Sequence, residues 1–393
     1  MADLLWPGDH RAGEVFTDAA FLAAMVSVEQ AWLDALAAAG VAAGAVRLAG
    51  AAGPADLPAL AEGAEADGNP VTGLVALLRE RTGSGWVHRG LTSQDVVDTA
   101  LVLCLRDALG RVRADAGRQA GALAGLVREH RTTLMAGRTL TQHAVPITFG
   151  LKAATWLQAL CAAVERLERG PAPPAQFGGA AGTLAAPAEL AGGAAAALAV
   201  AEDAAARLGL AWAAPWHTER SALTGPADAL VGLADVWGRI GGDVALLSRP
   251  EIGELREAAG GRSSTMPGKA NPVLSVLLRR HALAAPALAA TLHTAAAAYA
   301  DERPDGAWHA EWAPLRTLAR RSVTAAAQAA DLLEGLVVDP GRMRSRAERA
   351  AATLTAEQRA MGGPGADPGA YLGAADPIID AALHRAGRLW KDL

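Results

Sequence analysis

Residues 261–272 read GRSSTMPGKANP, and this stretch is the most informative one about the architecture and the chemistry expected of the chain. Glycine and small polar residues at its start favour a loop rather than regular structure. Asn271 is a residue type that caps helices, and Pro272 suits a first helical turn. We therefore expect a loop that leads into a helix, whose N-terminal N–H groups and dipole favour an anion in the loop.

The side chains of this loop predict proton transfer beside a carboxylate. Lys269 adds a positive charge that would bind a substrate carboxylate. Removing a proton from the carbon next to that carboxylate then costs less, because the negative charge moves onto the carboxylate oxygens. Ser263 or Ser264 would exchange the proton, if backbone donors or positive charge stabilise the alkoxide. The alternative is a glycine-rich surface loop that only caps a helix.

The composition excludes several classes of protein. With 393 residues, 51% of them hydrophobic, the chain can bury a large core, and its net charge of -5 argues against a nucleic-acid binder. Cys104 and Cys161 have no CxxC or metal-type spacing, and the N-terminus lacks the pattern of a signal peptide. We expect a cytoplasmic protein. Residues 281–300 approach the length of a membrane span, but their alanines, histidines and proline favour a buried bundle helix.

Alanine, leucine, arginine and glutamate dominate long windows and no convincing strand pattern is present, which predicts an all-α fold. Turn-rich breaks divide the chain into three expected domains: an N-terminal helical domain, a central long-helix bundle and a shortened C-terminal helical domain, at 1–91, 92–336 and 337–393. The expected helices are 17–40, 70–82, 93–130, 146–169, 187–208, 227–258, 272–300 and 310–336, with shorter ones within 343–361 and from 377.

A second polar cluster, HRGLTSQD, occupies residues 88–95 at the start of a long expected helix. Thr92 and Asp95 have the spacing of a capping box, and capping alone would explain one hydroxyl and one acid. Capping does not require Ser93 and Gln94, so we expect this cluster to bind substrate.

A third cluster, GRTLTQHAVP, occupies residues 137–146 and places Arg138, Thr139 and Gln142 before a helix that Pro146 is expected to open. It predicts another helix terminus that favours an anion, although such residues also precede ordinary helices. His217 and Arg220 lie in a short segment between helices, where loops often carry function, but such residues can equally be structural.

The chain contains no HExxH motif, no Walker loop, no strand followed by GxGxxG and no GxSxG elbow. The nine histidines have no evident metal-ligand pairing. We therefore expect neither a cofactor nor a metal.

Together GLTSQD, GRTLTQHAVPITFG and SSTMPGKANP resemble the three signature regions of the fumarase/aspartase superfamily, in this order and at similar separations. The resemblance extends over residues 1–340. It implies a three-domain fold with a long central helical bundle, and a homotetramer whose active sites each draw on three subunits. It also implies β-elimination of a di- or tricarboxylate, or the reverse addition, through an aci-carboxylate intermediate.

The resemblance also implies roles for individual residues. Ser263 would exchange the proton, while Lys269 and Asn271 would bind the carboxylate. The other expected substrate-binding residues are Thr92, Ser93, Gln94, Arg138, Thr139, Gln142, His217, Arg220, Ser264 and Met266.

Stretches outside the signatures, such as QFGGAAGTL, PWHTER and DERPDGAWHAEW, are most similar to the cycloisomerases that interconvert 3-carboxy-cis,cis-muconate and a carboxymuconolactone in the protocatechuate branch of aromatic catabolism. Leu140 agrees with this branch, because it replaces a histidine that other superfamily members associate with the leaving group. Lactone opening expels a carboxylate. Because the pKa of the corresponding acid is about 4.3, the carboxylate leaves as an anion and needs no proton donor.

Two alternatives stay open. Nitrite is also a stable anion, so a nitrosuccinate lyase tolerates Leu140 equally well, whereas a C–N lyase of a succinate derivative would need a proton donor. A non-catalytic relative is disfavoured by the intact signature residues. Arg262, Gly268 and Ala270 depart from the pattern usual in cycloisomerases, and the C-terminal domain is short, so the substrate preference can differ.

Overall fold

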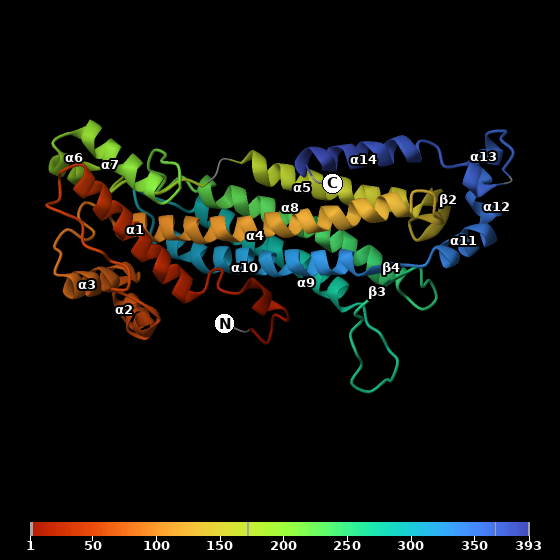
Figure 1. Cartoon of the computed structure of the whole chain (residues 1–393), viewed down its shortest axis with the longest axis horizontal. Helices are drawn as coiled ribbons and strands as arrows, with labels where there is room; N and C mark the ends of the chain where they lie inside the picture. Colours follow the sequence, from red (N-terminus) through yellow and green to blue (C-terminus); the bar gives the residue numbers. More distant parts are fainter. Residues whose placement is uncertain (1–2, 171–172, 366, 392–393) are drawn as a thin grey trace. The chain divides into compact units, whose positions relative to one another are not determined.

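Long helices make up most of the chain, and the expected all-α fold is confirmed (Figure 1). The computed structural model describes residues 3–170, 173–365 and 367–391. The longer helices are α1 (Asp18–Ala38), α2 (Leu57–Asp67), α3 (Val71–Thr82), α4 (Ser93–Glu129), α5 (Phe149–Arg169), α6 (Ala185–Ala191), α7 (Ala194–Arg207), α8 (Ser221–Leu247), α9 (Val273–Ala297), α10 (Gly306–Glu334), α11 (Pro340–Arg349) and α14 (Ala375–Leu389). Shorter helical segments are α12 (Ala351–Leu354), α13 (Ala356–Ala360) and the 3₁₀ turns η1 (Asp9–Ala12), η2 (Pro54–Asp56) and η3 (Pro368–Ala370).

Several expected helices differ from the observed ones. The helix expected over 187–208 is broken into α6 and α7, because Gly192 and Gly193 have φ values of 81° and 147° that no helix accommodates. The helix expected over 227–258 begins earlier, at Ser221, and ends at Leu247.

Short strands are present although the sequence showed no strand pattern. Strands β1 (Leu134–Thr139) and β2 (Gln142–Thr148) form an antiparallel hairpin, and β3 (Leu255–Glu257) pairs with β4 (Leu336–Val338). The prediction that Pro146 opens a helix was wrong, because this proline lies in β2 opposite Ala136, and α5 begins at Phe149. A two-stranded ladder has open edges, where a missing N–H is tolerated.

The described residues form two compact units. Unit 1 draws on Met1–Arg111, Arg169–Leu230 and Pro286–Val323, and unit 2 on Val112–Glu168, Val231–Ala285 and Thr324–Leu393. The expected division into three domains stays a prediction.

In unit 1, α1 supplies the centre of the core. Trp32 is fully buried and stacks on Phe177, with ring centroids 5.3 Å apart. Its indole N–H donates to the carbonyl oxygen of Arg89 at 2.8 Å, so this large side chain is buried with its polar atom satisfied. The contact fixes the segment that leads into α4 and hence the first signature region.

In unit 2, α8 and α9 approach very closely. A Cβ atom on Gly238 would lie 2.4 Å from the Cβ atom of Ala282, and one on Gly241 would lie 2.7 Å from the carbonyl oxygen of Ser275. Only glycine fits at these contacts. The C-terminal helices cover the β1–β2 hairpin, where Leu354 packs against Leu134 in one buried cluster.

Two described helices, α1 and α9, are long and apolar enough to cross a membrane by length and composition. Within the chain, 56% of the most apolar window of α1 is buried but only 28% of that of α9. Within the single chain, α9 keeps much of its apolar surface exposed, so the expectation of a buried bundle helix at 281–300 stays a prediction that depends on other subunits.

Candidate active site

The first signature region lies at the N-terminus of α4 in unit 1. Asp95 accepts the backbone N–H of Thr92 at 3.0 Å, as the capping-box spacing predicts. The hydroxyl of Thr92 accepts a hydrogen bond from Arg303, which also donates to the carbonyl oxygen of Ala180 at 3.0 Å. Ser93 is half-buried, so this first turn places a hydroxyl and a guanidinium close together.

Asp95 is buried and accepts hydrogen bonds from Gly178 N at 2.9 Å, Gly179 N at 3.0 Å and His217 Nε2 at 2.9 Å, in addition to Thr92 N. One carboxylate therefore ties three segments together: the start of α4, the glycine-rich stretch before α6 and the segment before α8.

A buried charge network follows one turn along α4. Arg220 donates to Asp98 at 2.7 Å and to Glu311 at 2.7 Å, and its guanidinium lies over the rings of Trp216 and Tyr299. Burial disfavours the charge of Arg220, but the two carboxylates raise its pKa. Burial raises the pKa of Glu311, and Arg220 opposes that shift.

This network occupies two of the expected substrate-binding residues. All three guanidinium nitrogens of Arg220 donate to protein oxygens, and the residue is 2% exposed. Gln94 is fully buried and donates to Asp98 at 3.2 Å and to the carbonyl oxygen of His217 at 2.9 Å. Both residues hold the fold of unit 1 together, and their contact with substrate stays a prediction.

In unit 2, residues 261–272 form a loop between β3 and α9 that extends away from both elements (Figure 1). Reciprocal backbone hydrogen bonds between Gly261 and Asn271, of 2.8 and 2.9 Å, close the loop at its base. Within it, the Oγ atom of Ser263 accepts the backbone N–H groups of Met266 at 3.0 Å and Thr265 at 3.3 Å. These are the backbone donors that an alkoxide needs.

The other expected site residues of the loop are accessible to solvent within the single chain. Ser264, Met266 and Lys269 are exposed, and Asn271 is half-buried. A substrate could reach the loop without a conformational change in this chain.

The first N–H groups of α9 are not available to an anion in the loop as expected. The helix begins at Val273, and the carboxylate of Glu257 accepts Leu274 N at 3.1 Å and Ser275 N at 2.8 Å. The prediction that these N–H groups favour an anion in the loop was therefore wrong, because a side chain of β3 already accepts their hydrogen bonds.

The third expected cluster forms the tip of the β1–β2 hairpin in unit 2. Thr139 and Gln142 are exposed at the ends of the strands. Arg138 is held by both oxygens of the buried Glu254, at 2.8 and 3.1 Å. Leu140, between the strands, is 96% exposed.

Comparisons with known proteins agree with these signature regions. Residues 13–285 match a protein family described as lyase. The chain is 45% identical to a nitrosuccinate lyase of Streptomyces davaonensis over 86% of the chain and 77% of that protein. It is 42% identical to a 3-carboxy-cis,cis-muconate cycloisomerase of Bradyrhizobium diazoefficiens, with the same two coverages.

The fold matches as well. The crystal structure of 3-carboxy-cis,cis-muconate lactonizing enzyme from Pseudomonas putida superposes with a TM-score of 0.85 at 33% identity, covering 96% of this chain and 97% of that one. The chain belongs to this lyase family. It is an enzyme of the fumarase/aspartase superfamily, as the signature regions predicted.

The signature residues of the lyase fall in both units. Unit 1 contains Thr92, Ser93, Gln94, His217 and Arg220, and unit 2 contains Arg138, Thr139, Gln142, Ser263, Ser264, Met266, Lys269 and Asn271. Hydrogen bonds join Gln94 and Arg220 to the carbonyl oxygen of His217. Within the described ranges, no such bond joins the loop at 263–271 to the hairpin tip at 138–142.

Sequence reasoning missed the acids that organise this lyase. Asp98 is fully buried near the start of α4, and an acid among buried residues signals a buried cation partner. Glu254 and Glu257 lie close to the loop in sequence, but only the folded chain shows that they bind Arg138 and cap α9.

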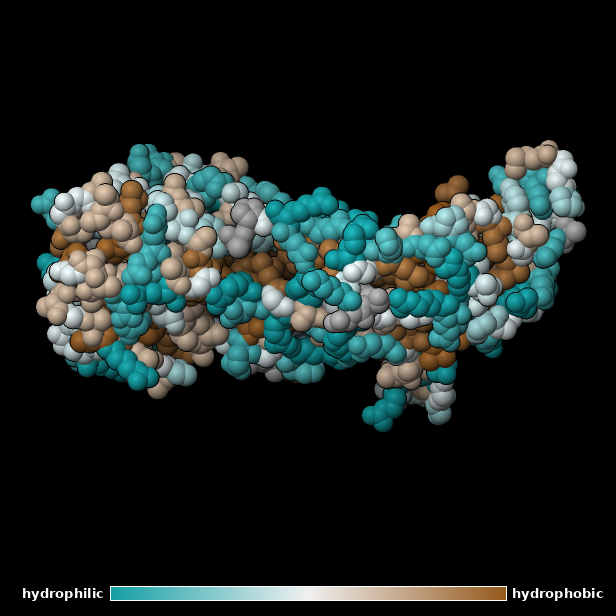
Figure 2. All heavy atoms as spheres, turned by 45° about the horizontal axis from the view of Figure 1, so that its top comes forward, coloured by the Kyte–Doolittle hydropathy of each residue, from teal (hydrophilic) through white to brown (hydrophobic). Residues whose placement is uncertain are grey.

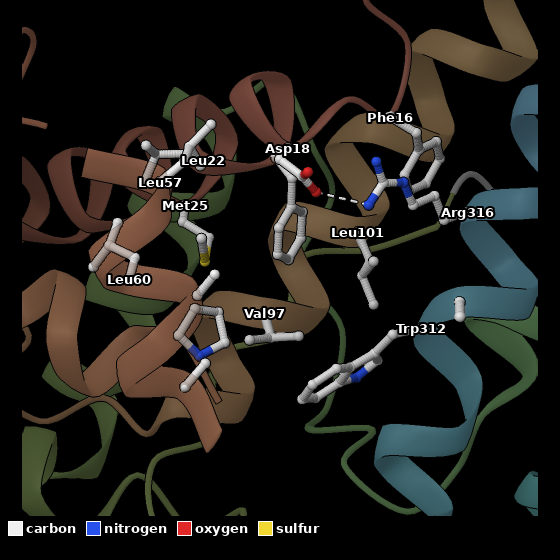
Figure 3. Close-up of a pocket in the computed structure, with 15 residues that line it drawn as sticks. Phe16, Asp18, Leu22, Met25, Leu57, Leu60, Val97, Leu101, Trp312 and Arg316 are labelled. Atoms are coloured by element: carbon white, nitrogen blue, oxygen red, sulfur yellow. Dashed lines mark hydrogen bonds and ion pairs between the residues drawn. The ribbon is translucent and has the colours of Figure 1, made fainter. Parts of the chain in front are cut away.

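Unit 1 also contains an apolar pocket of about 430 Å³ between α1, α2, α4 and α10 (Figure 3). Met25, Leu60, Val97 and Trp312 line it, and the only ion pair drawn at its wall joins Asp18 to Arg316 at 2.7 Å. The pocket contains no expected site residue, and an apolar lining does not suit a polycarboxylate. Three or more His, Cys, Asp or Glu side chains gathered as for a metal ion are not found in the described part of the chain.

Proposed function

We propose that this enzyme is a cycloisomerase that adds one carboxylate of 3-carboxy-cis,cis-muconate across a double bond of the same molecule to give a carboxymuconolactone. The observation that carries the proposal is the pair of backbone N–H groups at Ser263 Oγ, because they stabilise the alkoxide that proton exchange requires. Similarity to cycloisomerases of Bradyrhizobium diazoefficiens and Pseudomonas putida supports the choice of substrate.

In the proposed reaction, a carboxylate oxygen forms a bond to one alkene carbon, and the π electrons move to the neighbouring carbon and its carboxylate. Lys269 and Asn271 bind that carboxylate, which carries the extra charge of the aci-carboxylate intermediate. The hydroxyl of Ser263 then delivers its proton to the carbanionic carbon and recovers one from solvent. Nucleophile and alkene belong to one molecule, so the protein mainly has to fix the reactive conformer.

Leu140 agrees with this chemistry. In the reverse direction the leaving group is a carboxylate, which departs as an anion and needs no acid at that position. The side chain is 96% exposed within the single chain and can therefore meet substrate or another subunit.

A second candidate function is the elimination of nitrite from nitrosuccinate. The observation that favours it is 45% identity to a nitrosuccinate lyase over 365 residues. Nitrite also leaves without protonation, so Leu140 and Ser263 serve both reactions, and the substrate must be identified by assay.

Purified enzyme, assayed with each substrate in turn, separates the two candidates. For the cycloisomerase we expect loss of the diene absorbance of 3-carboxy-cis,cis-muconate without release of nitrite from nitrosuccinate. Release of nitrite together with an unchanged diene spectrum would replace the first candidate by the second. No turnover of either substrate would contradict both.

We also propose a homotetramer in the cytoplasm, with active sites shared between subunits. Apolar side chains reach the surface in patches on the face shown in Figure 2. On α9, Leu283 is 81% exposed and Val276 is 53% exposed, an arrangement that a neighbouring subunit would cover.

A further inference from the structure

The apolar pocket of unit 1 contains none of the expected site residues, yet it has the size of a ligand site. Its volume is about 430 Å³, and Met25, Leu60, Val97 and Trp312 reach it from α1, α2, α4 and α10 (Figure 3). Pockets that bind small molecules typically have volumes of about 300–1,000 Å³. The lining is deep, because Met25 and Val97 are only 3% and 1% exposed. The pocket is therefore large and apolar enough to hold a small molecule.

Short side chains keep the pocket open. Ala61 and Ala64 on α2 and Ala313 on α10 line it, and an alanine side chain ends at Cβ, so it cannot fill the space between these helices. Side chains that line unfilled space lose dispersion contacts on that side. Water restores little, because it finds few hydrogen-bond partners in an apolar cavity. An apolar occupant would regain these contacts.

The charge at the wall disfavours an ionic occupant. Asp18 and Arg316 are the charged residues of the lining, and Nη1 of Arg316 donates to Oδ1 of Asp18 at 2.7 Å. The two charges neutralise each other, so the pocket offers no net charge to a ligand. An ion would lose its hydration without gaining a partner of opposite charge, which costs free energy. The wall therefore favours an uncharged occupant.

Aromatic side chains and one thioether determine the shape of molecule that fits. Phe16, Phe21 and Trp312 line the pocket together with Met25. Aromatic rings favour edge-on or offset contacts with another ring, and a methionine sulfur also makes a favourable contact with a ring. A flat aromatic molecule makes both kinds of contact, whereas an aliphatic chain makes neither.

The wall of the pocket also contacts the buried charge network of unit 1. The ring of Trp312 packs edge-on against that of Trp308, with the ring centroids 4.8 Å apart. Nε1 of Trp308 donates to Oδ1 of Asp98 at 3.0 Å, and Asp98 binds Arg220. A ligand that moves Trp312 therefore acts on a side chain that is bonded to this network.

We propose that this pocket binds a small, uncharged aromatic molecule, and that Trp312 and Trp308 couple its occupancy to the buried charge network. The site is separate from the residues expected to bind the carboxylate substrate. The inference goes beyond the proposed function and does not depend on which substrate the enzyme turns over. It gives unit 1 a second kind of ligand, recognised by ring contacts rather than by charge.

Fluorine NMR titrations with fluorobenzene test the site directly. We expect the unaltered enzyme to bind this probe, and Ala64→Trp to weaken binding about 10-fold or more, because the indole fills the pocket. The matched control is Ala66→Trp, which places the same side chain at an exposed position of α2 outside the pocket. This control should bind the probe like the parent. Failure of the parent to bind fluorobenzene, or equal binding by the two variants, would overturn the proposal.

A charged probe tests the class of ligand. 4-Fluorobenzoate has the same ring but carries a carboxylate, so its affinity should not differ between the parent and Ala64→Trp. A loss in the variant as large as that for fluorobenzene would mean that the pocket takes anions. Propane-1,2,3-tricarboxylate, an unreactive tricarboxylate directed at the substrate site, should not displace fluorobenzene. Displacement would assign the probe to the substrate site and contradict a separate pocket.

A measurement on the unaltered protein covers the case in which Ala64→Trp does not fold. In protein labelled with ¹⁵N-tryptophan, fluorobenzene should shift the indole N–H resonances of Trp312 and Trp308, each identified by its loss when that residue is replaced by phenylalanine. The resonance of Trp237, which is buried in unit 2 with its N–H bound to Gln119, should not move. An unchanged Trp312 resonance would refute the site, and an unchanged Trp308 resonance would refute the coupling to the charge network.

Discussion

The carboxylate of Glu257 in β3 lies against the first turn of α9, where it accepts the backbone N–H of Ser275 at 2.8 Å and its hydroxyl at 2.7 Å. This contact joins the two ends of the loop that carries Ser263, because β3 precedes the loop and α9 follows it. The loop therefore starts and ends at elements that one buried acid holds together.

Glu257→Ala should destabilise unit 2, because it leaves the N–H groups of Leu274 and Ser275 without their acceptor. We expect a loss of about 1–3 kcal/mol in the free energy of unfolding, measured with urea. Glu251→Ala, which removes an exposed acid from the same segment, should change it little. Equal effects of the two substitutions would contradict the capping role.

Ser263→Ala should reduce kcat by about 10² to 10⁴-fold, because it removes the proposed proton donor, while thermal stability stays close to that of the parent. The measurement is a steady-state assay together with circular dichroism. Thr265→Ala is the control, since it keeps the backbone N–H that binds Ser263 and should retain activity. Normal turnover by the Ser263 variant would remove this serine from the mechanism.

Glu311 gives stability a dependence on pH, because burial raises its pKa above the ordinary value of 4.5 even though Arg220 opposes the shift. Between 4.5 and the raised pKa, the folded protein binds more protons than the unfolded chain, so stability falls as pH rises through this window. Glu311→Gln should lack this fall. Urea unfolding of both proteins at a series of pH values above about 4.5 tests the sign, and an advantage of the parent that grows with pH would refute it.

Leu283→Arg should weaken the proposed tetramer, since it places a charge on the exposed apolar face of α9. Light scattering after size-exclusion chromatography should show smaller species than for the parent. Leu198→Arg, on α7 and 40% exposed, controls for the added charge. A variant that keeps the mass of the parent would mean that α9 does not form the interface.

The sequence predicted the helices well where composition alone determines them. The expected helices at 70–82 and 93–130 agree with α3 and α4 to within a residue, because glycine or polar residues mark their ends. The hairpin of β1 and β2 was missed. Its turn residues, Leu140 and Thr141, have φ values of 47° and 71°, and neither is a glycine or asparagine that would reveal such a turn.

The candidate site was only partly predictable for a related reason. Motifs identified Ser263 and its loop, and the folded chain adds the two backbone donors to its Oγ atom. The partners of Arg138 and Arg220 could not be read from the sequence, since Glu254 and Glu311 lie about 90 residues or more away along the chain. Such long-range ion pairs depend on tertiary packing rather than on local pattern.

Arg220 carries one positive charge but binds two carboxylates, those of Asp98 and Glu311. When both acids are ionised, the interior of unit 1 therefore holds a net negative charge. The electric field of this charge is only weakly screened, because the dielectric constant of a protein interior is low. An anionic metabolite entering this region would be repelled from the interior and drawn toward Arg303 at the surface. The buried surplus of negative charge would thus help to orient the incoming molecule before any atom of it touches the protein.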